Sequence, residues 1–517
     1  MTNDAAQNVS LQYLRARLGR ICVAITGDTP HEMVERAEEA VRENTFIEFR
    51  LDYLAKPLAA LPKLKHFLEF HREATCIATC RRRVNGGKFT GTAAAQLEVL
   101  TKAATAGFEI IDLELQTAET MKPAALKKLR SAGAALLISH HDFKTTKDLE
   151  KIYARIEPLH PDFIKIVSTA RSLADNVKMM RFLESKGEEG NVVGICMGDY
   201  GVISRVLGLR AGSRFTFAAA TLGEETAPGQ IAARTLIESY RADQVDAATR
   251  VYGVAGNPVR HSLSPIMMNT AFHRETVNAV YLALQTEKIA DLLLLIREVP
   301  VHGVSVTMPL KQEIIKHLDR TDALSQKIGA CNTVVRSQDG KLIGYNTDVA
   351  GVVRPLEQRL DLRKAKILLL GAGGAARAAA FGLRQRGADV FILNRTPQAA
   401  QKLARSAGAK TMRRDQVAKT TFDAIVNATP VGMAGGKEET ILEEKELNTK
   451  LVFDMVYNPI DTPLLKMARA KGAAVITGVE MFVQQGAEQF QLWTGKPAPR
   501  DDMWRVVMHA LRSRTES

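Results

Sequence analysis

Residues 366–377 read K-I-L-L-L-G-A-G-G-A-A-R. The first five form a short apolar run, which is typical of a buried parallel strand. The glycines that follow allow a tight turn and let backbone amides approach a pyrophosphate at the N-terminus of the next helix. A strand, a glycine-rich turn and a helix in this order predict the start of a doubly wound nucleotide-binding sheet. The candidate contacts with the dinucleotide are Gly371, Ala372, Gly373, Gly374 and Ala375.

The next expected strand, at 390–393, ends in N-R-T. Proteins that bind NAD usually place an acidic residue here, where it accepts hydrogen bonds from the ribose hydroxyls. Asn394, Arg395 and Thr396 instead offer a cation and hydrogen-bond donors, which suit a 2′-phosphate. An exposed loop arginine without a ligand is the alternative interpretation. The glycine turn before it favours an NADP(H) site.

Towards the N-terminus, a polar connector at 241–249 separates two halves, and a strand at 251–255 opens the second one. In the first half, eight short apolar runs alternate with helical stretches such as 29–43 and 147–155. The runs lie at 21–25, 46–51, 75–79, 110–115, 134–139, 163–167, 192–197 and 215–219. Eight repeated strand–helix units predict a (β/α)8 barrel. The whole chain is therefore expected to be an α/β protein, a barrel followed by a dinucleotide-binding half.

Composition excludes several classes of protein. The 517 residues are 46% hydrophobic and 25% charged, which is typical of globular domains with their own cores. Five cysteines without a C-x-x-C pair indicate reduced thiols and a cytoplasmic location, and disfavour a zinc site or a disulfide framework. No apolar run approaches the roughly 18 residues needed to span a bilayer, and the first twenty residues lack a secretory signal. We therefore expect neither a metal nor a membrane partner.

The net charge is +13, and nearly all of it falls after residue 248. A basic solvated surface is one interpretation, and a field that attracts a phosphorylated cofactor is the other. Nucleic acid is disfavoured, because the densest basic block is the arginine run at 81–83.

Barrel enzymes place their chemistry at the carboxyl ends of the strands. Lys165 lies in the otherwise apolar run D-F-I-K-I-V. A lysine shielded from water has a free amine more often than one in water, so it can attack a carbonyl. The alternative is a lysine that extends to solvent at the strand end. His141, next to Asp142 at the end of the preceding strand, can carry protons.

Five segments resemble type I 3-dehydroquinate dehydratase in order: E-F-R-L-D (48–52), S-H-H-D-F (139–143), F-I-K-I (163–166), G-V-I-S-R (201–205) and A-P-G-Q (227–230). The resemblance implies that Lys165 forms a Schiff base with the C3 ketone of 3-dehydroquinate, and that His141 is the general acid and base. Implied substrate contacts are Glu48, Arg50, Arg81, Arg205, Thr226 and Gln230. Asn85 departs from the family, which usually has glutamate before the two glycines, and Thr226 replaces the more usual serine.

The second half resembles shikimate dehydrogenase through H-S-L-S-P (261–265), V-T-M-P-L-K (306–311), G-A-C-N-T (329–333), G-Y-N-T-D (344–348) and E-M-F-V-Q-Q-G-A-E-Q-F (480–490). The resemblance implies a catalytic pair, Lys311 and Asp348, for which a surface ion pair is the alternative. Implied substrate contacts are Ser262, Ser264, Thr307, Asn332, Tyr457 and Gln485. Met455 and Gly478 match positions near the nicotinamide.

The whole chain resembles the fused bifunctional dehydratase–shikimate dehydrogenase family. Dehydration of 3-dehydroquinate gives 3-dehydroshikimate, the ketone that the second half would reduce to shikimate with NADPH. The expected domains are an N-terminal arm (1–19), a (β/α)8 TIM barrel (20–245), an α/β substrate domain (250–350, completed by 479–517) and a Rossmann NADP domain (351–478). An NAD-dependent quinate/shikimate dehydrogenase with a non-catalytic barrel is the alternative.

Overall fold

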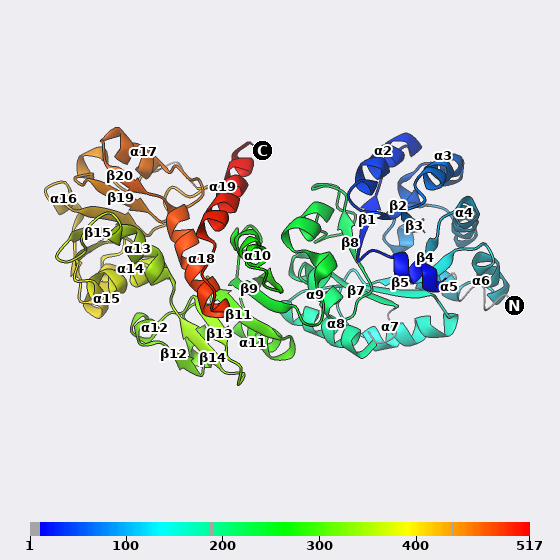
Figure 1. Cartoon of the computed structure of the whole chain (residues 1–517), viewed down its shortest axis with the longest axis horizontal. Helices are drawn as coiled ribbons and strands as arrows, with labels where there is room; N and C mark the ends of the chain where they lie inside the picture. The colour runs from blue at the N-terminus through cyan, green and yellow to red at the C-terminus, as the bar shows by residue number, and fades with distance from the viewer. Residues whose placement is uncertain (1–10, 187–190, 437–438, 517) are drawn as a thin grey trace. The chain divides into compact units, whose positions relative to one another are not determined.

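The computed structural model describes residues 11–186, 191–436 and 439–516 (Figure 1). It separates into two compact units whose main boundary lies between Thr249 and Arg250. Part of the expected N-terminal arm, residues 1–10, lies outside the described residues. No helix in the described part of the chain is long and apolar enough to cross a bilayer.

The first unit is a parallel barrel. Its strands are β1 (Ile21–Ile25), β2 (Phe46–Arg50), β3 (Thr75–Thr79), β4 (Ile110–Glu114), β5 (Ala135–His141), β6 (Phe163–Thr169), β7 (Val192–Met197) and β8 (Thr216–Ala219). Each strand pairs with the next in the sequence, and β8 pairs with β1. At the remaining seam β7 and β8 are in contact. The predicted (β/α)8 barrel is confirmed.

Helices surround these strands (Figure 1). They are α2 (Pro30–Val41), α3 (Pro57–Phe70), α4 (Ala93–Ala106), α5 (Leu115–Glu119), α6 (Pro123–Arg130), α7 (Leu149–Ile156), α8 (Leu173–Lys186) and α9 (Ser204–Arg210). Helix α2 illustrates why they form. The Thr29 side chain caps its N-terminus by accepting a hydrogen bond from the Glu32 amide, and Pro30 occupies the first turn. Met33, Ala37 and Val41 recur every four residues and bury one face.

The barrel interior is layered, because alternate residues of each strand point inward. The lowest layer is apolar and forms one core cluster, which includes Cys22, Phe46, Ile77, Ile110, Leu137, Phe163, Val193 and Phe215. Two residues further along five of the strands come polar side chains: Glu48, Thr79, Asp112, Ser139 and Lys165. Two residues further again come Arg50, Arg81, Glu114 and His141. The apolar layer therefore forms the floor of a polar site at the carboxyl ends.

Strand β5 is longer than the sequence indicates. It runs two residues past the expected end at Ser139, so His140 and His141 belong to the strand. The register with β6 continues to the pair His141 and Val167, and the amide of Asp142 then donates to the Val167 carbonyl at 2.8 Å. Pairing with a neighbouring strand, which local sequence does not reveal, extends β5 and fixes the direction of His141.

The second unit begins with a six-stranded sheet of order β10-β9-β11-β13-β14-β12. The strands are β9 (Arg250–Gly256), β10 (Ala279–Gln285), β11 (Val301–Val306), β12 (Arg320–Thr321), β13 (Thr333–Arg336) and β14 (Leu342–Tyr345). Helices α10 (Ser264–Arg274), α11 (Ile289–Glu298) and α12 (Ala323–Ile328) connect them. The C-terminal helices α18 (Gly478–Thr494) and α19 (Arg500–Glu516) share a core with this sheet through Tyr252, Phe272, Phe490 and Trp493.

The other sheet of this unit is entirely parallel, with order β17-β16-β15-β18-β19-β20. Its strands are β15 (Lys366–Leu370), β16 (Asp389–Leu393), β17 (Lys410–Thr411), β18 (Ala424–Asn427), β19 (Leu451–Asp454) and β20 (Ala474–Ile476). Helices α13 (Asp348–Glu357), α14 (Gly374–Gln385), α15 (Pro397–Ala407), α16 (Arg414–Val417) and α17 (Pro463–Ala470) accompany it. Numbered along the chain, the order is 3-2-1-4-5-6, that of a dinucleotide-binding fold. The predicted doubly wound sheet is confirmed.

Candidate active sites

The barrel encloses a cavity of about 490 Å³, measured with the space at its mouth. All eight barrel residues that the sequence singled out line it: Glu48, Arg50, Arg81, His141, Lys165, Arg205, Thr226 and Gln230. Phe143, Val167, Ile195, Met197 and Phe217 add apolar walls. Such a mixture of apolar wall and converging charge is typical of a site for a small polar ligand.

Lys165 is buried, with 4% of its surface exposed. The sequence indicated apolar surroundings, but the structure places charged groups around the amine. Its Nζ donates to Asp112 Oδ2 at 3.0 Å and lies 3.7 Å from Glu48 Oε1. The ring of Phe217 faces the same nitrogen at 3.8 Å. A cation at this nitrogen, whether ammonium or iminium, is therefore matched by carboxylates. The alternative of a lysine extending to solvent is wrong.

Asp112 is the centre of this charge network. Besides Lys165, it accepts from the Ser139 hydroxyl at 2.5 Å and from Arg81 at 3.3 Å. Burial opposes its ionisation, but Lys165 and Arg81 outweigh burial and hold the pKa of Asp112 well below its usual range. Asp112 therefore provides a fixed negative charge inside the barrel.

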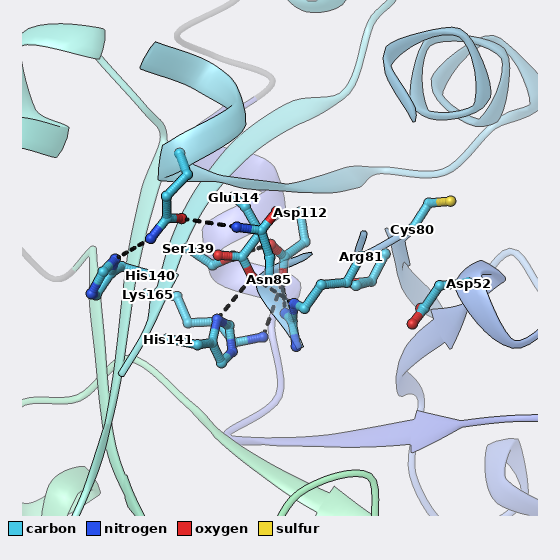
Figure 2. A network of polar contacts seen from close by, with 12 residues as sticks. Asp52, Cys80, Arg81, Asn85, Asp112, Glu114, Ser139, His140, His141 and Lys165 are labelled. Atoms are coloured by element: carbon cyan, nitrogen blue, oxygen red, sulfur yellow. Dashed lines mark hydrogen bonds and ion pairs between the residues drawn. The ribbon is translucent and has the colours of Figure 1, made fainter. Parts of the chain in front are cut away.

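Glu114 lies two residues further along β4, between a cation and a histidine (Figure 2). Its Oε1 is 2.5 Å from Arg81 Nε and 2.8 Å from His141 Nδ1. Burial raises the pKa of Glu114 to about 7, although Arg81 opposes the rise. Burial, together with the cations Arg81 and Lys165, holds the pKa of His141 well below its usual value. His141 is therefore neutral at pH 7, the state that a general base requires.

The other arginines of the cavity are held rigidly. Arg50 makes two hydrogen bonds to Asp52, at 3.0 and 2.9 Å. Arg205 is 2% exposed and donates to the carbonyls of Gly229 at 2.8 Å and Phe217 at 3.0 Å. No carboxylate pairs with Arg205 in the described part of the chain, and burial lowers the pKa of its guanidinium to about 10. A buried guanidinium without a counter-charge is suited to an anionic ligand.

On the loop after β8, Gln230 accepts hydrogen bonds from the amide and the hydroxyl of Thr226, at 2.7 and 3.0 Å. The two predicted contact residues therefore form one unit at the cavity wall. The threonine hydroxyl makes the bond that a serine in its place would also offer.

Sequence reasoning missed Asp112 and Glu114. Both lie in D-L-E at the end of β4, where the alternation that places Glu48 and Arg50 inward places them inward as well. This alternation of inward-facing polar residues at a strand end was the signal by which the sequence could have revealed both carboxylates. Asn85 does not stand in for them, because its amide donates to Gln116 Oε1 at 3.4 Å, and Gln116 in turn contacts His140.

In the second unit, Lys311 and Asp348 form a close pair with Nζ to Oδ2 at 2.6 Å. Asn332 donates to the other carboxylate oxygen at 2.7 Å and to Thr347 Oγ1 at 3.0 Å. Asp348 is 6% exposed and begins α13, where the helix dipole also favours its negative charge. The interpretation as a loose surface pair is wrong, because Asn332 and the helix fix the carboxylate from two further sides.

The remaining predicted contacts of this unit are fixed by their own neighbours. Ser262 Oγ accepts from the Ser264 amide at 3.1 Å at the start of α10. Thr307 follows β11, and its amide donates to the Ala255 carbonyl at 2.9 Å. Tyr457 stacks on Phe482 with ring centres 5.0 Å apart, and Gln485 donates to the Phe482 carbonyl at 2.9 Å. Tyr457 and Gln485 are thus brought together through Phe482.

The turn after β15 fits a pyrophosphate. Gly371 has φ of +112° and packs against Ala428, so its conformation suits glycine. At Gly373 and Gly374, by contrast, an added Cβ would meet nothing within 4 Å. Gly374 begins α14, so this open space lies at a helix N-terminus, where backbone amides attract phosphate.

The strand ends around this turn fit the rest of a dinucleotide. After β16, the Asn394 side chain donates to the Thr396 carbonyl at 3.0 Å and shapes the N-R-T loop, on which Arg395 is exposed. Met455 follows β19, and its amide donates to the Asn427 carbonyl at 3.0 Å. A Cβ at Gly478 would lie 2.4 Å from Val456, so glycine lets α18 begin directly beside this strand end.

Comparison with known proteins identifies four consecutive matches. The family model of type I 3-dehydroquinase matches residues 21–247, and that of the shikimate dehydrogenase substrate binding domain matches residues 254–334. The model of shikimate / quinate 5-dehydrogenase matches residues 355–457, and that of the shikimate 5′-dehydrogenase C-terminal domain matches residues 478–508. A chloroplastic bifunctional 3-dehydroquinate dehydratase/shikimate dehydrogenase of Arabidopsis thaliana is 34% identical, over 98% of this chain and 85% of the relative.

The chain belongs to the bifunctional 3-dehydroquinate dehydratase/shikimate dehydrogenase family. The NADP(+) shikimate dehydrogenase of Methanosarcina acetivorans is 41% identical over 51% of this chain and 99% of its own. A shikimate 5-dehydrogenase structure from Thermus thermophilus, in complex with NADP(H) and shikimate, is 37% identical with a TM-score of 0.47, covering 51% of this chain and all of that one.

Family membership confirms the predicted function class: a shikimate-pathway enzyme with a lyase and an oxidoreductase activity. It also confirms NADP(H) as the coenzyme, since several shikimate dehydrogenases similar to the second half are NADP(+) enzymes. The alternative of an NAD-dependent enzyme with a non-catalytic barrel is disfavoured by both findings. In the described part of the chain, no three histidine, cysteine or carboxylate side chains gather as metal ligands would.

Proposed function

We propose that Lys165 and His141 carry out the dehydration of 3-dehydroquinate, and that Lys311 and Asp348 carry out the reduction of 3-dehydroshikimate to shikimate. The observation that carries the first assignment is the single cavity that both barrel residues line. The second rests on the close pair of Lys311 with Asp348. We place the domain limits at 20–245 for the barrel, 250–350 with 479–517 for the substrate domain and 351–478 for the coenzyme domain.

Dehydration begins at the Lys165 amine, which attacks the C3 ketone and expels its oxygen as water, leaving a cationic imine. Asp112 and Glu48, both close to Nζ, stabilise that cation. His141 removes the C2 proton, and the electron pair moves into the imine to give an enamine. The enamine then expels the hydroxyl on the next carbon, which leaves as water with the proton from His141. Water hydrolyses the imine, releasing 3-dehydroshikimate and the free amine.

The polar side chains that line the cavity orient the substrate. Arg81 and Arg205 bind the carboxylate, and Glu48, Arg50, Thr226 and Gln230 contact the hydroxyls. Arg205 is suited to the carboxylate because it is buried and carries no counter-charge of its own among the described residues. Holding the ring against a walled cavity also keeps bulk water away from the enamine.

In the second unit, NADPH supplies the hydride when it is bound. Lys311 delivers a proton to the oxygen that becomes the new hydroxyl, and Asp348 holds the lysine in place. Ser262, Ser264, Thr307, Asn332, Tyr457 and Gln485 bind the hydroxyls and carboxylate of the ring. The turn at 371–375 holds the pyrophosphate, Asn394, Arg395 and Thr396 hold the 2′-phosphate, and Met455 and Gly478 flank the nicotinamide.

A cytoplasmic location is part of the proposal. All five cysteines are buried and free, which fits a reducing compartment. Fractionation of the source cells, with recovery of both activities in the cytoplasmic fraction, is the corresponding test.

A coupled assay tests the overall function. The protein is given 3-dehydroquinate and NADPH, and shikimate is expected to accumulate as NADPH is consumed. With shikimate as substrate in reverse, NADP+ is expected to be preferred over NAD+ by at least tenfold in kcat/KM, on the order of 1.4 kcal/mol. A preference for NAD+ would overturn the assignment of Arg395.

Borohydride trapping tests the role of Lys165. Incubation with 3-dehydroquinate and borohydride is expected to give a covalent adduct, located at Lys165 by peptide mass spectrometry. Lys165→Ala is expected to lose the adduct and at least 10³-fold of dehydratase kcat, because no other amine replaces the imine nitrogen. Its reductase kcat is expected to stay within twofold of wild type. An adduct elsewhere, or a dehydratase rate that survives, would remove Lys165 from the mechanism.

A further inference from the structure

Three buried polar atoms meet beside the barrel cavity: Glu114 Oε1, His141 Nδ1 and Arg81 Nε. All three are shielded from solvent, and none makes a regular hydrogen bond among the described residues, so the two short distances are ion-pair contacts. Buried polar atoms are rarely left without a partner. Arg81 Nε and His141 Nδ1 each have the same polar neighbour, Glu114 Oε1, and Glu114 therefore stands between them (Figure 2).

Glu114 supplies the carboxylate next to His141 that Asn85 does not supply. The Asn85 amide donates away from His141, to Gln116, and carries no charge. In the described part of the chain, Glu114 is the carboxylate within ion-pair distance of His141. Asp112, whose charge also acts on the pKa of His141, is already held by Ser139, Arg81 and Lys165.

We propose that Glu114 is the positioning residue of His141, and that its carboxylate selects which ring nitrogen of the histidine carries the proton. The proposal rests on the proposed function of His141 as the general acid and base. Because Nδ1 faces Glu114, the other ring nitrogen, Nε2, is the one left to exchange protons with substrate.

The protonation state of Glu114 has a direct consequence for His141. An ionised carboxylate accepts Nδ1–H, which leaves a lone pair on Nε2 and makes the ring a base towards the C2 proton. A protonated carboxyl donates to Nδ1 instead and forces the proton onto Nε2, so the ring can no longer take one from carbon. The Glu114–His141 pair titrates as a unit, and its base-competent form requires an ionised Glu114.

Charged groups from every neighbouring strand act on that carboxyl. Arg81 just after β3, His140 on β5 and Lys165 on β6 favour its ionised form, and Asp112 on β4 itself opposes it. Burial is the largest influence and places the pKa of Glu114 at about 7. The fraction of base-competent His141 therefore rises with pH through neutrality, and dehydratase kcat/KM is expected to fall about tenfold per pH unit below that point.

Glu114→Gln tests the proposal, because glutamine keeps the shape but neither carries charge nor titrates. We expect dehydratase kcat to fall on the order of 10–10²-fold and the acid limb near pH 7 to disappear. Trapping at Lys165 and the reductase activity should persist. Glu98→Gln is the matched control, since Glu98 is an exposed partner of Lys102 on α4. It is expected to match wild type in both rate and pH profile.

Unchanged kcat with an unchanged acid limb in Glu114→Gln would overturn the proposal. Loss of the Lys165 adduct from a folded variant would also overturn it, because Glu114 would then act on imine formation. If Glu114→Gln does not fold, Glu114→Asp decides, since it keeps a titrating carboxyl one methylene further away. A reduced rate with the acid limb retained supports the proposal, and a wild-type rate overturns it.

Nitrogen-15 chemical shifts of His141 provide a readout that a purely structural role would not change. In wild type at pH 8, Nδ1 is expected to be protonated and Nε2 bare, and this preference should be lost in Glu114→Gln. Failure of the proposed function would give a different result. Wild-type protein itself would then give no Lys165 adduct, or His141→Ala would keep full dehydratase activity.

Discussion

At the scale of single residues, the barrel site depends on one carboxylate. Asp112 contacts Lys165, Arg81 and Ser139, and all three are themselves buried. Taking two cations out of water is costly unless a counter-charge comes with them. The network therefore makes the burial of Lys165, the proposed nucleophile, compatible with a folded interior. The amine is shielded from water, as the sequence indicated, but it is shielded by charge as well as by apolar walls.

Asp112→Asn is expected to destabilise the barrel by about 3 kcal/mol at pH 7, since it leaves Lys165 and Arg81 buried without this counter-charge. Because the folded-state pKa of Asp112 is depressed, its stabilising effect is present above the unfolded value near 4 and is lost as pH falls below it. The difference in the free energy of unfolding between wild type and Asp112→Asn, measured by urea unfolding of the barrel, should therefore become smaller in acid. A difference from wild type that does not vary with pH would contradict this account.

At the scale of elements, short strands place the chemistry because each turns alternate residues inward. Strands β2, β3, β4 and β5 each supply one polar residue to each of two successive layers, above an apolar floor. The start of α14 plays the corresponding role in the second unit, where glycines leave room in front of a helix N-terminus.

Two glycines of the turn after β15 are expected to respond differently to alanine. Gly373→Ala places a methyl in the open space, so it should weaken NADP+ binding about tenfold, roughly 1.4 kcal/mol, with little change in Tm. Gly371→Ala must adopt a positive φ against Ala428, so it should lower stability by about 1–3 kcal/mol. Calorimetric titration with NADP+ and thermal unfolding separate the two effects. If both variants changed NADP+ affinity and Tm to the same extent, the two glycines would not have the separate roles assigned here.

At the scale of the whole molecule, each site is built from residues of a single unit. The barrel cavity uses residues before Thr249, and the Lys311–Asp348 pair lies after it. Chemistry in one unit therefore does not require side chains from the other.

Complementation between variants is the corresponding test. A mixture of Lys165→Ala and Lys311→Ala proteins is expected to convert 3-dehydroquinate to shikimate, because 3-dehydroshikimate released by one protein can enter the other. Neither variant alone should do so, and the steady-state rate of the mixture should approach that of the slower wild-type step. No shikimate from the mixture would mean that the intermediate must pass between the sites of one chain.

The sequence by itself determined the barrel and the doubly wound sheet, and it singled out Lys165, His141, Lys311 and Asp348 as candidates, because apolar periodicity, a glycine turn and ordered motifs are local properties. It did not determine what surrounds those residues. Asp112 reaches Lys165 across 53 positions of sequence, and Glu114 meets His141 only because β4 and β5 pair in one register. Contacts of this kind follow from closure of the sheet, which aligns strand ends that are distant in the chain.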